Sequence, residues 1–137
     1  MVAMTDRVDF DVEQGIAVIT VNNPPVNALS HAVREGIYDG VKKALDDDSV
    51  IGVVIFCEGR TFIAGADISE FGSAPKEPHL PAVLSLLDES TKPIVAAVHG
   101  TALGGGLETT LCCNYRVAVS GAKFGLPEVH LGLLPGA

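Results

Sequence analysis

The sequence predicts an α/β fold, built on a largely parallel sheet with short helical crossovers. Runs of β-branched residues alternate along the chain with amphipathic segments, in the order β-α-β-(α)-β-α-β. The 137 residues suffice for one domain of ordinary size, and 47% of them are apolar against 19% charged, which excludes intrinsic disorder. Neither an internal repeat nor a change of composition marks a second domain.

The N-terminal region is expected to form a β-hairpin followed by a helix. Apolar and acidic residues alternate over Val8–Val12, Gln14-Gly15 supplies the turn, and Ile16–Val21 is rich in β-branched residues. Two prolines then end the second strand, because proline has no N–H for the ladder. Ser30 is placed to cap a helix whose apolar residues recur at helical spacing over 33–45.

Two continuous apolar runs, Val50–Cys57 and Ile94–Val98, are typical of strands that are buried on both faces. Between them, a glycine-containing loop over 59–67 leads into one helical turn. A proline-containing loop over 72–81 follows, which we expect to be the most mobile part, and then a helix candidate over 82–88.

The C-terminal third begins with three consecutive glycines at 104–106. Leu107–Cys113 then indicates a buried helix and Tyr115–Val119 another strand, whereas the chain from Lys123 onward is expected to be loop-like.

Charge and composition narrow the classes of partner. The formal net charge is −8 and the pI is near 4.7, so the chain lacks the basic footprint that nucleic acids and anionic membranes require. No apolar run is long enough for a membrane span, and the N-terminus has no secretory signal pattern. The three cysteines form no pairing framework and predict a reduced compartment, so we expect a cytoplasmic protein.

Several common site motifs are excluded. Gly104-x-Gly106 lacks the third glycine of the dinucleotide fingerprint, and Gly106 occupies the place of the lysine in a phosphate-binding loop. The four histidines are scattered, with no pair at metal-ligand spacing, so no metal site is predicted.

Two glycine-rich junctions remain, one over 62–67 and the other over 99–108. Glycines that open a helix expose unpaired backbone N–H groups at the positive end of the helix dipole, where they can hold an oxyanion. The same glycines can serve only to let a helix pack closely on a strand. The residues alone favour neither interpretation.

Two acidic residues, Glu108 and Glu128, stand among apolar neighbours. A carboxylate beside apolar walls tends to hold its proton, which general acid/base catalysis near neutral pH requires. Each can equally be a charge in the first turn of a helix or in an exposed loop. Two donor-rich turns with two such carboxylates would suit chemistry on a carbonyl compound that passes through an enolate.

Four segments resemble one known family. PPVNALS, FIAGADISEF, HGTALGGGLE and GLPEVHLGLLPGA occur in the order and spacing of the enoyl-CoA hydratase/isomerase (crotonase) superfamily, and within it resemble the N-terminal hydratase part of the multifunctional β-oxidation enzymes. The resemblance covers essentially the whole chain. It implies the crotonase (ClpP-like) fold, a spiral of ββα units, and hydration of 2-trans-enoyl-CoA to 3-hydroxyacyl-CoA.

The resemblance also assigns roles to residues. Ala66 and Gly105 match the positions whose backbone N–H groups form the oxyanion hole for the thioester carbonyl. Glu108 matches the glutamate that activates water for attack at C3, and Glu128 the one that protonates C2. The positions that match stretches contacting CoA and the thioester are Val26, Asn27, Ala28, Leu29, Ala64, Gly65, Asp67 and Ile68.

Further implications concern the whole protein. Residues 1–137 match the N-terminal part of one hydratase/isomerase domain, without the C-terminal helices that cover the pocket and build a trimer interface in the family. The resemblance implies an acyl-CoA substrate and no cofactor in this chain, with NAD only where a 3-hydroxyacyl-CoA dehydrogenase part follows. A trimer-type homo-oligomer or a fused dehydrogenase domain is the expected partner, and a peroxisomal location stays open.

Three alternatives to hydration remain. They are Δ3,Δ2-enoyl-CoA isomerisation, another crotonase-type reaction such as thioester hydrolysis, and non-catalytic binding of acyl-CoA.

Overall fold

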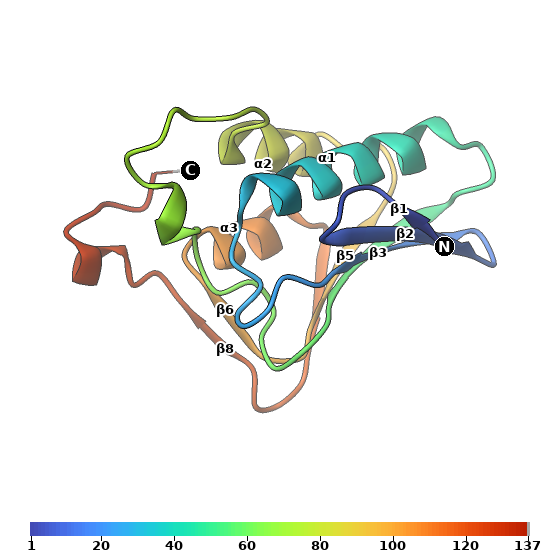
Figure 1. The fold of residues 1–137 in the computed structure, drawn as a ribbon. Coiled ribbons are helices and arrows are strands. Elements are labelled where there is room, and N and C mark those ends of the chain that lie inside the picture. Colours follow the sequence, from blue (N-terminus) through green and yellow to red (C-terminus); the bar gives the residue numbers. More distant parts are fainter. Residues whose placement is uncertain (137) are drawn as a thin grey trace.

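The computed structural model describes residues 1–136. Its main element is a six-stranded mixed sheet (Figure 1). Its order is β1-β2-β3-β4-β5-β7, antiparallel through β3 and parallel from β3 onward. The strands are β1 (Val2–Ala3), β2 (Val8–Glu13), β3 (Ile16–Val21), β4 (Gly52–Cys57), β5 (Ile94–Val98) and β7 (Tyr115–Ala118). The predicted α/β class with parallel pairing is confirmed.

The predicted N-terminal hairpin and helix are both present. Gln14 and Gly15 have φ of 50° and 81°, the left-handed conformations that a tight hairpin turn requires, and Val8 pairs with Val21 at the open end. Helix α1 (His31–Asp46) begins as expected, because the Ser30 side chain accepts a hydrogen bond from the N–H of Val33.

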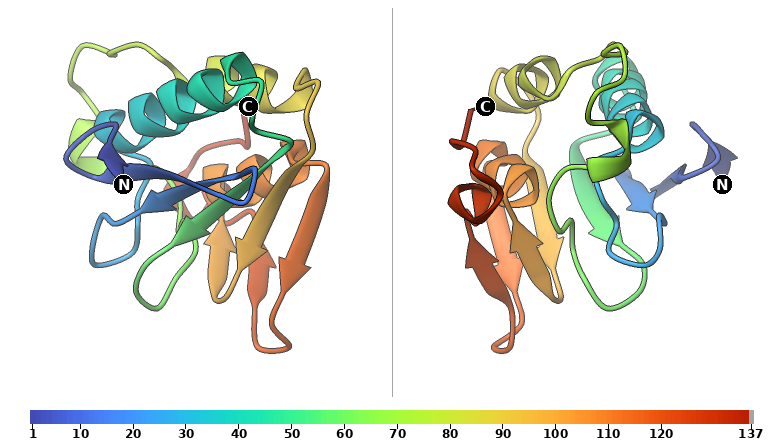
Figure 2. Two further views of the ribbon diagram at one scale, coloured as in Figure 1. Left: turned by 90° about the vertical axis from the view of Figure 1, so that its right-hand side faces the viewer. Right: turned by 60° about the vertical axis from the view of Figure 1, so that its left-hand side comes forward.

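Helix α1 and helix α2 (Leu80–Asp88) lie side by side over one face of the sheet, and α3 (Gly105–Cys112) follows α2 (Figure 2). The core fills the space between this helical layer and the sheet, and its largest fully buried side chains include Ile19, Ile37, Ile55, Phe62 and Leu87. The predicted helix over 82–88 is confirmed but begins two residues earlier, with Pro81 in its first turn.

The prediction that two strands are buried on both faces is wrong. Val54 and Phe56 of β4 and Val95 of β5 are only half-buried, because in residues 1–136 the helices cover a single face of the sheet. Ile51 is 67% exposed and precedes β4, which starts at Gly52. Edge strand β7 is exposed along its whole length. The apolar runs therefore reflect the β-branched composition of the sheet rather than double coverage.

A second, two-stranded sheet was not predicted. Strand β6 (Thr101–Leu103) pairs in parallel with β8 (Lys123–Gly125), so the expectation of a loop from Lys123 onward is wrong for these residues. Three-residue strands are too short for a period of two to be recognised. Two short 3-10 helices complete the structure, η1 (Ile68–Glu70) and η2 (Glu128–Leu131).

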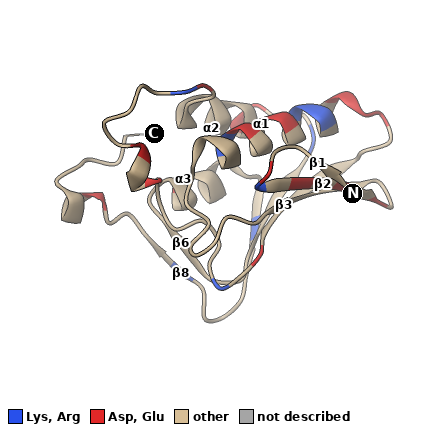
Figure 3. Ribbon diagram, viewed as in Figure 1, with Lys and Arg blue, Asp and Glu red and all other residues tan. Residues whose placement is uncertain are grey.

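Charged residues are spread along the chain, and several acidic ones lie on the hairpin and on α1. Acidic segments are frequent on α1 and β2, as Figure 3 shows. None of the helices within the described part of the chain is long and apolar enough to span a membrane.

Candidate active site

A cavity of about 320 Å³ opens where the segment after β4 meets the junction of β6 and α3. It brings together seven residues that were assigned to the site from the sequence: Ala64, Gly65, Ala66, Ile68, Gly105, Glu108 and Glu128. The remainder of its wall is mostly apolar and includes Phe71, Leu80 and Leu103. Apolar walls with a few polar groups are typical of a small-molecule site.

Backbone contacts hold the two glycine-rich junctions together. The N–H of Leu103 donates to the carbonyl oxygen of Ile63 at 3.0 Å, and Ala64 forms a parallel bridge with Leu103. A Cβ on Gly104 would lie 3.6 Å from the Cα of Gly65. The residues that follow these two glycines, Gly105 and Ala66, are therefore neighbours at one wall of the cavity.

Both neighbouring residues present an unused donor. Gly104, with φ of 55°, is the N-cap of α3, so the N–H of Gly105 belongs to the first helical turn, which has no acceptor within the helix. Among residues 1–136, neither the N–H of Gly105 nor the N–H of Ala66 donates a hydrogen bond. Two such neighbouring donors, one of them in the first turn of a helix, suit an anionic oxygen.

The other glycines of the second junction have a packing role. A Cβ on Gly106 would collide with the carbonyl oxygen of Ile63, and one on Gly100 with the carbonyl oxygen of Arg60. A Cβ on Gly105 would instead meet only side-chain ends, those of Leu29 and Leu80. Gly100 and Gly106 therefore pack closely against backbone, as one of the two interpretations of the sequence requires, whereas Gly105 lines the cavity and packs only against side chains.

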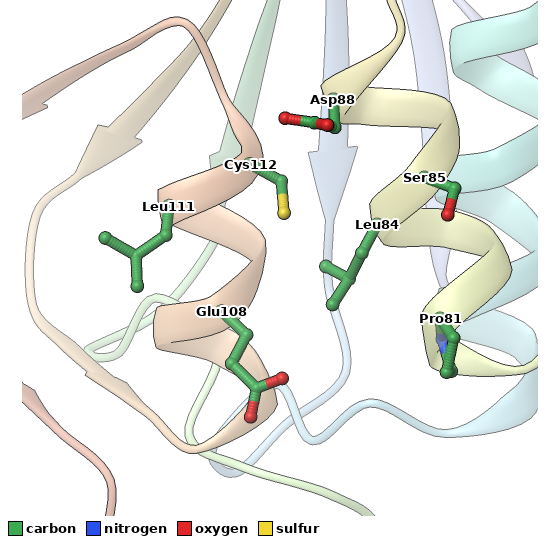
Figure 4. A pocket seen from close by; sticks show the side chains of 7 residues that line it. All are labelled: Pro81, Leu84, Ser85, Asp88, Glu108, Leu111 and Cys112. Atoms are coloured by element: carbon green, nitrogen blue, oxygen red, sulfur yellow. The ribbon is translucent and has the colours of Figure 1, made fainter. Parts of the chain in front are cut away.

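Glu108 lies in the first turn of α3 and borders two hollows. Besides the cavity, it lines a groove of about 370 Å³ between α2 and α3, shared with Leu84 and Leu111 (Figure 4). Its Oε2 atom is buried. The expectation of a buried helix with leucines around Glu108 needs correction, because Leu111 is 59% exposed. The buried face of α3 consists of Gly105, Gly106, Thr109 and Thr110.

Glu128 approaches the same wall from the C-terminal segment. It opens η2, and its Oε1 atom would lie 2.5 Å from a Cβ on Gly104. Its Oε2 atom is buried and accepts no hydrogen bond from any described residue. A buried carboxylate oxygen without a donor is costly unless it is protonated or meets a water or ligand. This oxygen therefore stands at the cavity wall, where a water or a bound molecule can supply the missing donor.

Three of the remaining residues assigned from the sequence have side chains with structural roles. The Nδ2 of Asn27 donates to the carbonyl oxygens of Glu58 and Thr61 at 2.8 and 3.1 Å, and Asn27 is 2% exposed. Leu29 is equally buried. Asp67 caps η1 through its Oδ1, which accepts from the N–H and hydroxyl of Ser69. Because the side chains of Asn27 and Leu29 are buried, only the backbone of these two residues can contribute to binding.

Val26 and Ala28 lie in a shallow groove next to the cavity. The groove has a volume of about 360 Å³ and is shared with Ala64, Ala66 and Ile68. Ala66 borders both hollows, so a ligand that extends from the cavity can continue into this groove.

Of the three cysteine thiols, those of Cys57 and Cys113 are buried. Burial raises the pKa of the Cys113 thiol to about 12, and burial also raises the pKa of Cys57. Within residues 1–136, no group of three or more His, Cys, Asp and Glu side chains is arranged to hold a metal ion.

Comparisons with curated proteins relate this site to known ones. The chain is 49% identical over 126 residues to the peroxisomal bifunctional enzyme of Danio rerio, covering 92% of this chain and 18% of that protein. It is 42% identical over 138 residues to the probable enoyl-CoA hydratase of Bacillus subtilis, covering 96% of this chain and 54% of the relative. The chain thus spans about half, or less, of the length of these relatives.

Solved structures share the fold. The enoyl-CoA hydratase from Bacillus anthracis superposes with a TM-score of 0.88 at 28% identity, over 96% of this chain and 55% of that one. An enoyl-CoA hydratase/isomerase family member gives a TM-score of 0.87 at 30% identity, again with about half of its chain covered. The crotonase fold expected from the four motifs is therefore confirmed. Residues 11–137 match the sequence profile of the family described as enoyl-CoA hydratase/isomerase, and the chain belongs to that family.

Proposed function

We propose that this chain catalyses the hydration of 2-trans-enoyl-CoA thioesters to 3-hydroxyacyl-CoA. One observation carries the proposal: the N–H groups of Ala66 and Gly105 donate no hydrogen bond within residues 1–136, and both residues line a mostly apolar cavity that Glu108 and Glu128 also line. The names of the relatives, which include enoyl-CoA hydratase and peroxisomal fatty acid beta-oxidation multifunctional proteins, support the same reaction class.

The reaction places a demand on each group. Attack of water on C3 of the conjugated thioester moves an electron pair through C2 to the carbonyl oxygen. The N–H groups of Ala66 and Gly105 stabilise this oxygen, and a donor of this kind is worth roughly 3–4 kcal/mol in acyl-transfer sites. Glu108 takes the proton of the attacking water, and Glu128 delivers a proton to C2. The products balance, since one water is added across the C2–C3 bond.

A second candidate reaction uses the same groups. Two carboxyl groups that border one cavity can move a proton from C2 to C4, which is Δ3,Δ2-enoyl-CoA isomerisation. Here the N–H pair would stabilise the same enolate oxygen, and no water would be added.

The organisation of the whole protein is also a proposal. The chain spans 54% of the Bacillus subtilis relative, and its motifs resemble those of the N-terminal part of the family's domain, so we infer that residues 1–137 form that part of one hydratase/isomerase domain. A trimer-type assembly or a fused dehydrogenase part that uses NAD would complete it. The cytoplasmic location stays a prediction, and several relatives are named as peroxisomal.

The test measures loss of the thioester conjugation absorbance of crotonoyl-CoA in the presence of the chain. Glu108→Gln and Glu128→Gln should each lower kcat by about 10²–10⁴ and change KM little, because acid/base groups act in the transition state. Glu13→Gln, at an exposed carboxylate of β2, is the matched control and should behave as the parent.

The outcomes separate the alternatives. Normal turnover in either site variant removes that glutamate from the mechanism. Conversion of a 3-enoyl-CoA without hydration of crotonoyl-CoA selects the isomerase, and binding of both thioesters without turnover selects a binding module.

A further inference from the structure

An almost buried arginine lies behind the cavity wall. Arg34, in the first turn of α1, has only 12% of its side chain exposed. Its Nη1 donates to the carbonyl oxygen of Leu29 at 2.8 Å and to Oε1 of Glu70 at 3.2 Å. Its Nε and Nη2 donate to the carbonyl oxygens of Pro78 and Lys76, at 2.9 and 3.2 Å. One side chain thus joins three segments that are separate in the sequence.

Glu70 completes the cluster. Its second oxygen, Oε2, accepts a hydrogen bond of 2.7 Å from the N–H of His31, the first residue of α1. A carboxylate is favourable there because the helix N-terminus carries partial positive charge. The ring of His31 in turn contacts the carbonyl oxygen of Glu77 through Nε2 at 2.7 Å. The loop after η1 is therefore fastened to α1 at several points.

The fastened segments lead directly to the proposed oxyanion donors. The N–H of Leu29 donates to the carbonyl oxygen of Gly65 at 2.9 Å, and Leu29 forms a parallel bridge with Ala66. At the other end of the loop, Leu80 follows two residues after Pro78. The methyl groups of Leu29 and Leu80 would lie 2.7 and 2.8 Å from a Cβ on Gly105, so both leucines face that residue.

Arg34 itself stays outside the cavity. It lines a different hollow of about 230 Å³, behind Leu29, Ala66 and Leu80, and it is not among the described residues that line the cavity. It therefore does not touch a molecule bound between Glu108 and Glu128.

We propose that Arg34 is a positioning residue, which fixes the segments of Leu29 and of the 71–80 loop so that the N–H groups of Ala66 and Gly105 face one point. The guanidinium fork suits this role, since it can reach four acceptors in fixed directions, whereas a lysine ammonium is a point charge on a flexible stem. The catalytic consequence rests on the proposed function, but the positioning itself does not.

The experiment compares Arg34→Ala with Arg34→Met by amide hydrogen exchange. The reporter is the N–H of Leu29, whose bond to Gly65 is the link between Arg34 and the Ala66 segment. We expect its exchange in Arg34→Ala to rise roughly tenfold or more, while the N–H groups of Ile19 and Ile55 in the central strands keep theirs, because the opening is local. Added guanidinium ion should restore protection in Arg34→Ala but not in Arg34→Met, where the methionine fills the space.

Lys92→Met is the matched control. The Nζ of Lys92 donates to the carbonyl oxygens of Ala44 and Asp47, so it fastens the opposite end of α1. Its loss should leave the exchange of the Leu29 N–H as slow as in the parent chain.

The results decide the proposal whether or not the chain hydrates thioesters. Unchanged exchange at Leu29 in Arg34→Ala, or an equal rise in every variant, overturns it. If the parent hydrates crotonoyl-CoA, kcat of Arg34→Ala should fall about tenfold or more and recover with guanidinium. If the Leu29 N–H exchanges faster in Arg34→Ala but kcat is unaltered, the proposed link between Arg34 and the N–H groups of Ala66 and Gly105 is contradicted. A parent without hydration refutes the proposed function alone, and the exchange pattern still decides the positioning.

Discussion

Replacing Gly105 with alanine separates the two roles of the glycine-rich turn. The new Cβ would lie 2.7 Å from Cδ1 of Leu29 and 2.8 Å from Cδ2 of Leu80. Carbon atoms pack at about 3.5–4.0 Å, so both leucine methyl groups must retreat by roughly 1 Å. Leu29 is 2% exposed and has little room to move. Overpacking of this kind costs about 1–3 kcal/mol of unfolding free energy.

The effect on catalysis should be larger than the effect on stability. The turn can relieve the overlap by shifting its own backbone, which moves the N–H of Gly105 away from the point that it shares with Ala66. Removal of one oxyanion donor lowers kcat by about 10²–10³. We therefore expect Gly105→Ala to fold, to melt several degrees lower and to lose at least about 10² in kcat on crotonoyl-CoA.

The assay pairs thermal unfolding by circular dichroism with the crotonoyl-CoA absorbance assay. Gly121→Ala is the control, because nothing lies within 4 Å of a Cβ at Gly121, and it should match the parent in both measurements. A folded Gly105→Ala chain with reduced melting temperature and parental kcat would refute the oxyanion assignment. The glycine would then be a packing residue like Gly106.

Three further outcomes are expected elsewhere in the chain. Ser30→Ala removes the acceptor for the N–H of Val33 and should lower the unfolding free energy by about 1 kcal/mol in urea titrations. Alkylation of the native chain near pH 8, followed by mass spectrometry, should modify the half-buried Cys112 ahead of Cys113, whose pKa near 12 keeps the thiol protonated. The raised pKa of Cys113 also makes stability depend on pH, because above the unfolded thiol's pKa near 8.5 only the unfolded chain gains by losing this proton. The unfolding free energy, measured as the urea midpoint, should therefore fall as the pH rises from about 8.5 toward 12. The fall should be smaller in Cys113→Ala.

Local signals made part of the fold predictable. The Gln14-Gly15 turn, the alternation over Val8–Val12 and the Ser30 cap each act over a few residues, and each was found where the sequence indicated. The partner of strand β6 was not predictable in this way. Its three residues pair with Lys123–Gly125, and no local periodicity records a contact made by so distant a segment.

In the candidate site, too, local motifs were predictable from the sequence and tertiary contacts were not. Its motifs pointed to Gly105 and Glu108, but which glycine packs and which faces the cavity depends on the position of Ile63, a tertiary contact. Asn27 was assigned to binding through its backbone, and nothing in the sequence indicated that its buried side-chain amide joins two loop carbonyls. Arg34 carried no sequence signal beyond its place on a polar helix face, because its acceptors are backbone carbonyls, which every residue has.

The glycine contacts between the two junctions have a consequence for how this site can change. Gly100 lies against the backbone of Arg60, Gly104 near that of Gly65 and Gly106 against that of Ile63, so the two loops meet largely through main-chain atoms. One loop therefore cannot move toward the other without a main-chain clash. These main-chain contacts set the distance between Ala66 and Gly105. Under the proposed function, substitutions at Phe71, Leu84 or Leu111 would reshape the walls around a bound molecule without altering the main-chain contacts that space Ala66 and Gly105.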